Sequence, residues 1–340
     1  MLSRAVVVGL GLVLVAGCGS GSDPAAPTPP AASVGANGSG NGTIYSSLRD
    51  ITAGTLTITA HPITSDGSLG AATVLLSEPA DDTTYPFVVD GLGPTALTGT
   101  FNDYWTTDLQ VRADGQVTGE VAAPRWCGGE GLSYNPCALL DRTRLARTTE
   151  LGRDPATGDG PAEGSVLVSS LVDGSTIAEL GPFADLSMML GTGSPDKVLI
   201  VTTPARSAED PSVPSTVLRL DTTDGLTAEV GDSPVDWAPL CPIGTDSVLG
   251  FTSQDTAAAS VVGPAQVAAI TWEQQDSVVG CSADGRFLYL QRIPQPPTEE
   301  VEDTEPPNPS TAIERITLAD GSRSEVLVLP PGEVAAPITR

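Results

Sequence analysis

The side chains that most often do chemistry are scarce in this chain of 340 residues. His61 is the single histidine, and no G-x-S-x-G sequence supplies the nucleophile of a serine hydrolase. One histidine cannot serve both a serine–histidine relay and a histidine-rich metal site. We therefore expect His61 to be a satisfied or an exposed histidine rather than a general base.

Acidic side chains, by contrast, are abundant. The chain has 42 Asp and Glu against 16 Lys and Arg, which gives a formal net charge of −26. Such a charge repels phosphate backbones and argues against nucleic acid as a partner. A glycosidase needs two carboxylates at a fixed separation, but the sequence singles out no pair. No D-x-D-x-D-G calcium loop occurs, and we predict neither a metal nor a cofactor.

Arginines and tryptophans could bind a ligand. The one basic cluster comprises Arg142, Arg144, Arg147 and Arg153. Arginines can clamp a carboxylate or a phosphate, and tryptophans can stack on sugar rings. The four tryptophans are Trp105, Trp126, Trp237 and Trp272. The simpler interpretation is that the arginines balance local acids and that most tryptophans anchor the core.

The N-terminus has the features of a targeting signal. One arginine, Arg4, precedes an apolar run of eleven residues, which is too short to span a bilayer about 30 Å thick. The run ends in Val15-Ala16-Gly17-Cys18, which resembles the lipobox of bacterial lipoproteins. The resemblance implies removal of residues 1–17 as a signal peptide and attachment to a membrane through lipidated Cys18. It also implies a location in the cell envelope, on the extracytoplasmic face of a membrane. An ordinary signal peptide, with Cys18 incidental, is the alternative.

Residues 18–44 are rich in Gly, Pro and Ser and cannot form a core, so we expect a flexible, disordered tether there. Beyond Cys18, four cysteines remain, and an even number in an exported chain favours two disulfides. Three pairings are open. We favour Cys127–Cys137 and Cys241–Cys281, because each closes a local loop, and the second would tie neighbouring repeats together. The chain has no C-x-x-C sequence, which argues against a zinc site.

Residues 45–340 consist of short strand-like runs separated by turn signals. The segments 193–201 and 280–290 align, each with Ser-x-Asp, a turn and an apolar strand, and 244–251 is a weaker copy. Their aspartates, at positions 196, 246 and 284, are 50 and 38 residues apart. This spacing is close to the length of one four-stranded propeller blade.

A second motif places Asp-Gly between two apolar runs. This is a hairpin signal, because glycine adopts positive φ at low cost. The copies are Asp66-Gly67, Asp114-Gly115, Asp173-Gly174, Asp224-Gly225 and Asp320-Gly321.

Together these motifs resemble TolB-like β-propeller repeats, most clearly over residues 186–330. The resemblance implies an all-β fold, a β-propeller of six or seven four-stranded blades or an incomplete ring of them. The family's Ser-Pro-Asp-Gly turn is incomplete in each copy, since Lys197 follows Asp196 and Ala283 replaces the proline. A pair of β-sandwiches, or a partial propeller packed on an N-terminal β-domain, is the alternative.

Long polar segments between the second and third strands of the repeats are predicted to crowd one face of the propeller. They are 204–214, 254–266 and 293–309. The last contains the candidate binding residues for a basic protein or a cationic polymer, which are Glu299, Glu300, Glu302, Asp303 and Glu305. A solvated insertion without a partner is the plainer interpretation.

We therefore expect a lipid-anchored, non-enzymatic interaction or scaffold module that binds an envelope protein or a cell-wall partner. The TolB-like resemblance implies protein docking. A lipoprotein that binds a small ligand or a glycan through a central Trp and Arg pocket is the second hypothesis. The third is an enzyme on the same scaffold, which a close acid–histidine pair in a cleft would favour.

Overall fold

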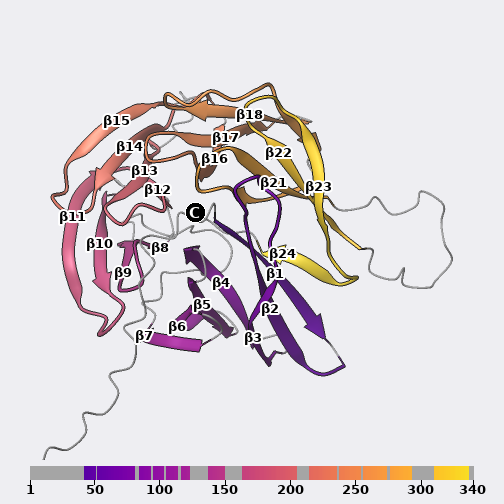
Figure 1. The fold of residues 1–340 in the computed structure, drawn as a ribbon. Coiled ribbons are helices and arrows are strands. Elements are labelled where there is room, and N and C mark those ends of the chain that lie inside the picture. Colours follow the sequence, from indigo (N-terminus) through magenta and orange to yellow (C-terminus); the bar gives the residue numbers. More distant parts are fainter. Residues whose placement is uncertain are drawn as a thin grey trace, which may run out of the picture. The chain divides into compact units, whose positions relative to one another are not determined.

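The computed structural model describes residues 42–50, 52–80, 84–92, 95–102, 105–113, 116–122, 137–149, 163–204, 214–235, 237–253, 256–273, 276–292 and 310–336. The regular elements in these ranges are strands, arranged in six four-stranded antiparallel sheets. Each sheet is one blade of a β-propeller, and the blades follow one another around a common axis (Figure 1). Within these ranges, no helix has the length and apolar character to cross a membrane.

The strands of the first three blades are given from the axis outward. Blade 1 contains β24 (Glu333–Ala336), β1 (Thr43–Asp50), β2 (Thr55–Pro62) and β3 (Thr73–Pro79). Blade 2 contains β4 (Thr84–Leu92), β5 (Thr95–Asn102), β6 (Trp105–Ala113) and β7 (Gln116–Ala122). Blade 3 contains β8 (Cys137–Leu139), β9 (Arg144–Thr148), β10 (Glu163–Ser170) and β11 (Thr176–Ala184).

The remaining three blades follow the same order. Blade 4 contains β12 (Leu186–Gly191), β13 (Lys197–Thr202), β14 (Thr216–Asp221) and β15 (Thr227–Asp232). Blade 5 contains β16 (Trp237–Pro242), β17 (Val248–Ser253), β18 (Thr256–Val262) and β19 (Thr271–Glu273). Blade 6 contains β20 (Ser277–Cys281), β21 (Phe287–Arg292), β22 (Ala312–Thr317) and β23 (Arg323–Val328).

Blade 1 closes the ring, because its strands come from both ends of the described chain. The late strand β24 takes the innermost place and pairs antiparallel with β1, with Tyr45 opposite Ala336 and Leu48 opposite Glu333. In the other five blades, four consecutive strands follow one another outward from the axis. The last stretch of the described chain is therefore hydrogen-bonded to the first.

The turns follow the predicted motifs. The Asp-Gly turns at 173–174, 224–225 and 320–321 join the third and fourth strands of their blades, each with its glycine at a φ near 70°. In the turn between β14 and β15, Asp224 Oδ1 accepts the Leu226 N–H at 2.9 Å. A short acidic side chain that accepts a backbone N–H two residues on stabilises the turn locally.

The core lies between the blades. Strand β13 is buried from Val198 to Val201, and its apolar run is continuous because neighbouring blades cover both of its faces. The outermost strands are half exposed, and each carries a glutamate, which discourages edge-to-edge pairing with another chain. These residues are Glu78, Glu120, Glu179, Glu229, Glu273 and Glu325.

The predicted all-β propeller is confirmed, with six blades, and the β-sandwich alternative is wrong. Strand β1 begins at Thr43, two residues before the predicted start of the propeller domain at residue 45. Segment 254–266 is not a long loop, because 256–262 forms β18, of which Ala257–Val262 is paired with β17. Its alanine-rich sequence has low strand propensity, and tertiary pairing overrides that local preference.

Candidate functional site

A group of buried polar side chains lies where blade 1 packs against blade 6. We call it the closure seam and define it by the side chains of Ser46, His61, Gln291, Thr311 and Glu333, all of them buried. Apolar side chains from both blades surround it, including Ile44, Val279, Phe287, Tyr289 and Ala335. The ring is closed at this seam, so its polar contacts bear directly on whether the propeller stays closed.

Strand register explains why the polar residues meet. On β1, Ile44, Ser46 and Leu48 alternate onto the same face of the sheet. His61 on β2 is opposite Ile44, and Glu333 on β24 is opposite Leu48. Cross-strand partners share a face, so Ser46 stands diagonally between the imidazole and the carboxylate.

The hydrogen bonds of this cluster indicate which ring nitrogen of His61 carries a hydrogen. The Ser46 hydroxyl donates to the Glu333 carboxylate, and Ser46 Oγ lies 2.9 Å from His61 Nε2. A serine hydroxyl has one hydrogen, which the carboxylate already accepts. The bond to His61 therefore requires Nε2 to carry a hydrogen and to donate it to Ser46 Oγ.

The pKa of His61 is lowered from its ordinary value. Burial disfavours the imidazolium and dominates, while the charge of Glu333 acts in the opposite direction and only partly offsets it. Neutral His61 in the Nε2–H tautomer is thus the form that the seam accommodates near pH 7.

Gln291 and Thr311 of blade 6 bind the backbone of β24. Gln291 Oε1 accepts the Ala335 N–H at 3.0 Å, and the Thr311 hydroxyl donates to the Glu333 carbonyl at 3.1 Å. Gln291 Nε2 in turn donates to Thr311 Oγ1 at 3.1 Å. The innermost strand is therefore held by β1 on one side and by two side chains of the neighbouring blade on the other.

This arrangement differs from a catalytic relay. In a serine hydrolase the histidine stands between the serine and the acid, whereas here the serine stands in the middle. Ser46 is 1% exposed, so its hydroxyl does not meet a solvent-borne substrate in this structure. The acid and the histidine share a buried interface, and the chemistry they support is strand-to-strand anchoring.

A second set of contacts crosses the same interface at the loop between β2 and β3. The Tyr289 hydroxyl donates to the Gly67 carbonyl at 2.9 Å, and Arg286 and Arg315 donate to the carbonyls of Ser65 and Asp66. Both guanidinium groups also lie over the Phe287 ring, 5.1 and 5.2 Å from its centroid. Burial raises the pKa of Tyr289, which remains a neutral donor.

A substitution at Gly67 tests these contacts between the β2–β3 loop and blade 6. Its φ is +81°, and an added Cβ would lie 2.7 Å from Phe287 Cε2 and 2.8 Å from Arg315 Cδ. We expect Gly67→Ala to cost about 3 kcal/mol of unfolding free energy, from backbone strain together with overpacking. Gly54→Ala is the matched control, because Gly54 has φ +62° and nothing within 4 Å of the added Cβ. Gly54→Ala should cost about 1 kcal/mol of unfolding free energy in the same denaturant titration. Equal losses for the two variants would show that overpacking at Gly67 contributes nothing.

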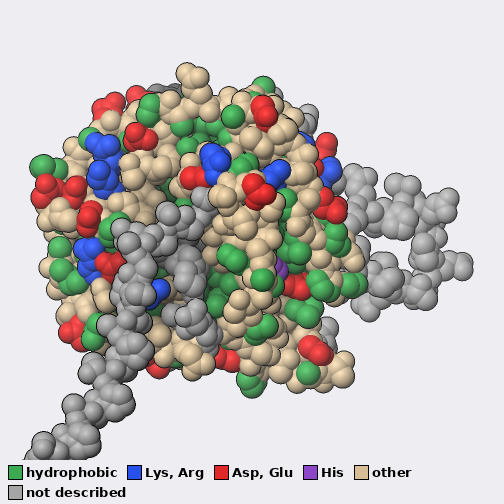
Figure 2. Space-filling model, viewed as in Figure 1, with side chains coloured by type: hydrophobic (Ala, Val, Ile, Leu, Met, Phe, Trp, Pro, Cys, Tyr) green, Lys and Arg blue, Asp and Glu red, His purple; other side chains and the backbone are tan. Residues whose placement is uncertain are grey.

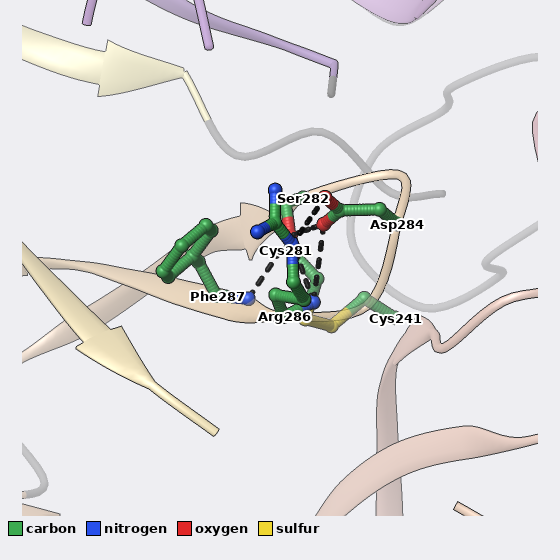
Figure 3. Close-up of a disulfide and its surroundings, with 6 residues drawn as sticks. All are labelled: Cys241, Cys281, Ser282, Asp284, Arg286 and Phe287. Carbon is green, nitrogen blue, oxygen red and sulfur yellow. Dashed lines mark hydrogen bonds and ion pairs between the residues drawn. A yellow bond between two sulfur atoms is a disulfide. The ribbon is translucent and has the colours of Figure 1, made fainter. Parts of the chain in front are cut away.

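The predicted disulfide between Cys241 and Cys281 is present. It joins β16 to β20, the innermost strands of blades 5 and 6, and so ties neighbouring repeats together (Figure 3). The adjacent turn is closed by Ser282 Oγ, which donates to Asp284 and accepts the N–H groups of Arg286 and Phe287. Burial pushes the pKa of Asp284 upward, but its bonds to Ser282 and Arg286 outweigh burial and the net pKa is lowered.

The other cysteines and the candidate acidic residues are only partly covered. Cys137 is buried in β8 and disulfide-bonded, while Cys127, its predicted partner, lies outside the described residues. Cys18 also lies outside them, as do Glu299, Glu300, Glu302, Asp303 and Glu305. In the ranges that the structure covers, no group of His, Cys, Asp and Glu side chains could hold a metal ion.

Arg144 and Arg147 of the predicted basic cluster are bound to nearby protein groups. Arg144 Nε lies 2.7 Å from Asp141 Oδ2, and its Nη2 lies 3.5 Å from Asp196 of the next blade. Arg147 donates to Ser169 Oγ at 3.4 Å, and burial lowers its pKa. Arg142 is exposed and Arg153 lies outside the covered ranges. In Figure 2, acidic and basic side chains are interspersed on the visible face rather than gathered by sign.

Two tryptophans serve the core as predicted. Trp237 and Trp272 are 7% and 5% exposed in blade 5, where Trp272 packs on Phe251 with ring centroids 5.9 Å apart. The Trp105 side chain and Trp126 lie outside the described part. The two tryptophans whose side chains are described are therefore part of the core, and Arg144 is held in ion pairs with Asp141 and Asp196.

These features define the chain's class as a six-bladed, all-β propeller closed by a late strand. No family model matches the sequence, and no curated relative does. Among solved structures, the chain is similar to TolB from Acinetobacter baumannii, at 13% identity and a TM-score of 0.44 over 87% of this chain and 67% of that one.

Two enzyme structures are similar at comparable levels. An oligogalacturonate lyase from Vibrio parahaemolyticus has 11% identity and a TM-score of 0.41 over 86% of this chain and 74% of its own. An acylaminoacyl peptidase from Pyrococcus horikoshii has 8% identity and a TM-score of 0.40 over 84% of this chain and 39% of its own. Likeness at these levels assigns neither an activity nor a partner to this chain.

Proposed function

We propose that this protein is an exported, lipid-anchored envelope scaffold without enzymatic activity, whose propeller binds a basic protein partner through one face. That face carries the connections between the second and third strands of the blades. The observation that supports the proposal is the length of three such connections. They are 149–162 in blade 3, 203–215 in blade 4 and 293–311 in blade 6.

Topology places these connections on a common side. Strands alternate in direction within an antiparallel blade, so equivalent connections of different blades leave from the same face of the propeller. The corresponding connections are short in blades 1, 2 and 5, at residues 51–54, 103–104 and 254–255. Functional residues commonly lie on loops that a rigid scaffold positions, and here three of the six blades supply long ones.

Charge supports the chemical class of the partner. The three long connections contain ten Asp and Glu residues against two arginines. An acidic face attracts a basic surface over distances up to about a Debye length and repels nucleic acid and anionic lipid. In this proposal a lipid on Cys18 holds the domain at a membrane.

A pull-down from solubilised envelopes tests the proposal. The full chain is the bait, and a variant lacking Ile293–Pro309 is compared with a second variant whose five acids in that segment become Gln or Asn. We expect one partner to be captured by the intact chain, lost with the deletion and weakened by neutralisation or by 0.5 M salt. Reproducible absence of a partner, or equal capture by all three baits, would contradict the proposal.

The deletion must leave the fold intact for this comparison to hold. Loop length contributes little to stability, so we expect the unfolding free energy to change by no more than about 1 kcal/mol. Thermal unfolding of both variants beside the intact chain checks this. A large loss on deletion would show that the segment belongs to the core.

A further inference from the structure

We propose that Ser46, His61 and Glu333 form an acid-sensitive latch on β24, which holds the propeller ring closed at neutral pH and releases this strand when His61 takes up a proton. The proposal does not depend on the identity of any partner. It rests on the position of these three residues at the closure seam and on the hydrogen bonds they make.

Strand β24 is the element that such a latch can move. It has four residues and pairs with one neighbour, β1. Val334, in its middle, is 47% exposed, so the strand borders solvent even though Glu333 and Ala335 are buried. A short strand that is paired on one side only opens at lower free energy than a strand in the middle of a sheet.

The hydrogen bonds of the latch stay the same when His61 takes up a proton, because Nε2 already carries the hydrogen that it donates to Ser46 Oγ. What changes is the charge, which is then buried at the seam. Ser46 uses its only hydrogen for the Glu333 carboxylate and accepts the Nε2–H of His61. A proton added from solvent at Nδ1 converts the imidazole to an imidazolium within an apolar interface. Glu333 is linked to the ring by way of the Ser46 hydroxyl, and its charge offsets the cost of burial only in part. Opening β24 admits water to the imidazolium and relieves the desolvation cost.

The charges around His61 are few. Glu333, on β24, is the charged side chain whose field acts on it. From blade 6, Tyr289 faces the same interface as a neutral hydroxyl bound to the Gly67 carbonyl. Arg286 and Arg315 of that blade are engaged by backbone carbonyls of the 64–68 turn, and Arg286 also by Asp284. Burial therefore dominates the pKa of His61 and lowers it in the closed ring.

The sign of the pH effect follows from linkage. The pKa of His61 is lower in the closed ring than in an opened or unfolded state, where it is about 6.5. The contribution of neutral His61 to closure is therefore complete above about pH 6.5 and is lost as the pH falls from there toward the folded pKa. The equilibrium constant for opening β24 at low pH should rise by up to about tenfold for each pH unit by which the closed ring lowers the pKa of His61.

Hydrogen exchange of the full chain at pH 7.5 and pH 5.5, corrected for the intrinsic pH dependence of exchange, tests the latch. We expect faster corrected exchange at the lower pH in Glu333–Ala336 and in Tyr45–Leu48, with no change in β13. His61→Gln is the key variant, because its amide NH₂ can stand where Nε2–H stands but does not titrate. It should show no pH effect at the seam.

Glu333→Gln is the second variant. It keeps an acceptor for Ser46 but removes the charge that favours the imidazolium, so the pH response should begin at the same pH and extend to lower pH. Since His61 is the only histidine, its imidazole NMR signals give its titration directly in the unaltered chain. A seam response that persists in His61→Gln, that is absent in the unaltered chain, that extends equally to β13, or that falls outside the interval between about pH 6.5 and the midpoint of the His61 titration would overturn the proposal.

Discussion

A chain that ends at Pro330 is expected to lose the cooperative fold of the propeller. The truncation removes β24 and leaves the edge of β1 unpaired from Tyr45 to Leu48. It also removes the β24 groups to which Ser46, Gln291 and Thr311 are hydrogen-bonded. Ser46 keeps its bond to His61, and Gln291 keeps its bond to Thr311. Each lost backbone bond is worth about 1 kcal/mol, and a buried polar atom left unpaired costs about 1–3 kcal/mol. The loss is therefore several kcal/mol, which is a large part of the whole stability of an ordinary domain.

A chain that ends at Ala336 is the matched control, because it keeps every residue of β24. We expect it to unfold in one cooperative transition close to that of the full chain. The shorter chain should instead show a broad transition or none in far-UV circular dichroism, and should aggregate in size-exclusion chromatography through its open edge. Equal melting temperatures for the two chains would show that the ring does not need its closing strand.

Loss of the Cys241–Cys281 disulfide is expected to have the second largest effect on stability. The bond closes a loop with a sequence separation of 40 and joins the innermost strands of blades 5 and 6. Loop-closure entropy for that separation predicts a loss of about 4 kcal/mol when the bond is removed. We expect a double variant with alanine at both positions to unfold at correspondingly lower denaturant concentration, with its blade contacts otherwise intact.

The two single variants control for the side chains themselves. Cys241→Ala and Cys281→Ala each remove the same covalent bond, so each should lose about as much unfolding free energy as the double variant. Additive losses would mean that packing of the individual sulfurs matters and that the cross-link does not. Denaturant unfolding of all three variants and the unaltered chain under oxidising conditions measures this.

Local turn chemistry made the blades predictable from the sequence. The Asp-Gly turns after β10, β14 and β22 need only a glycine at positive φ and an aspartate that accepts nearby N–H groups, and both are readable along the chain. The Ser-x-Asp turn before β21 is equally local, since Ser282 and Asp284 bond within five residues. The same local reading failed at β18, where alanines form a strand because β17 pairs with them.

The contacts of the closure seam could not be predicted from local sequence patterns. Ser46 and Glu333 are 287 residues apart, and no pattern between them indicates a contact. His61 was weighed as satisfied or exposed, and only the neighbouring blade makes it buried and places it beside Ser46. Pairing of distant strands depends on how many blades complete the circle, and that number follows from packing between sheets rather than from any one repeat.

The sequence by itself determined the hairpins and the apolar second strands within single blades, and it favoured the pairing of Cys241 with Cys281 between neighbouring blades. Those features depend on neighbours within a few tens of residues. Only the tertiary structure decided that the blades number six, that β24 completes blade 1, and that the chain's single histidine sits in the seam this creates. The physical reason is that ring closure is a long-range event. Its contacts arise only when all the blades are packed, so no local preference encodes them.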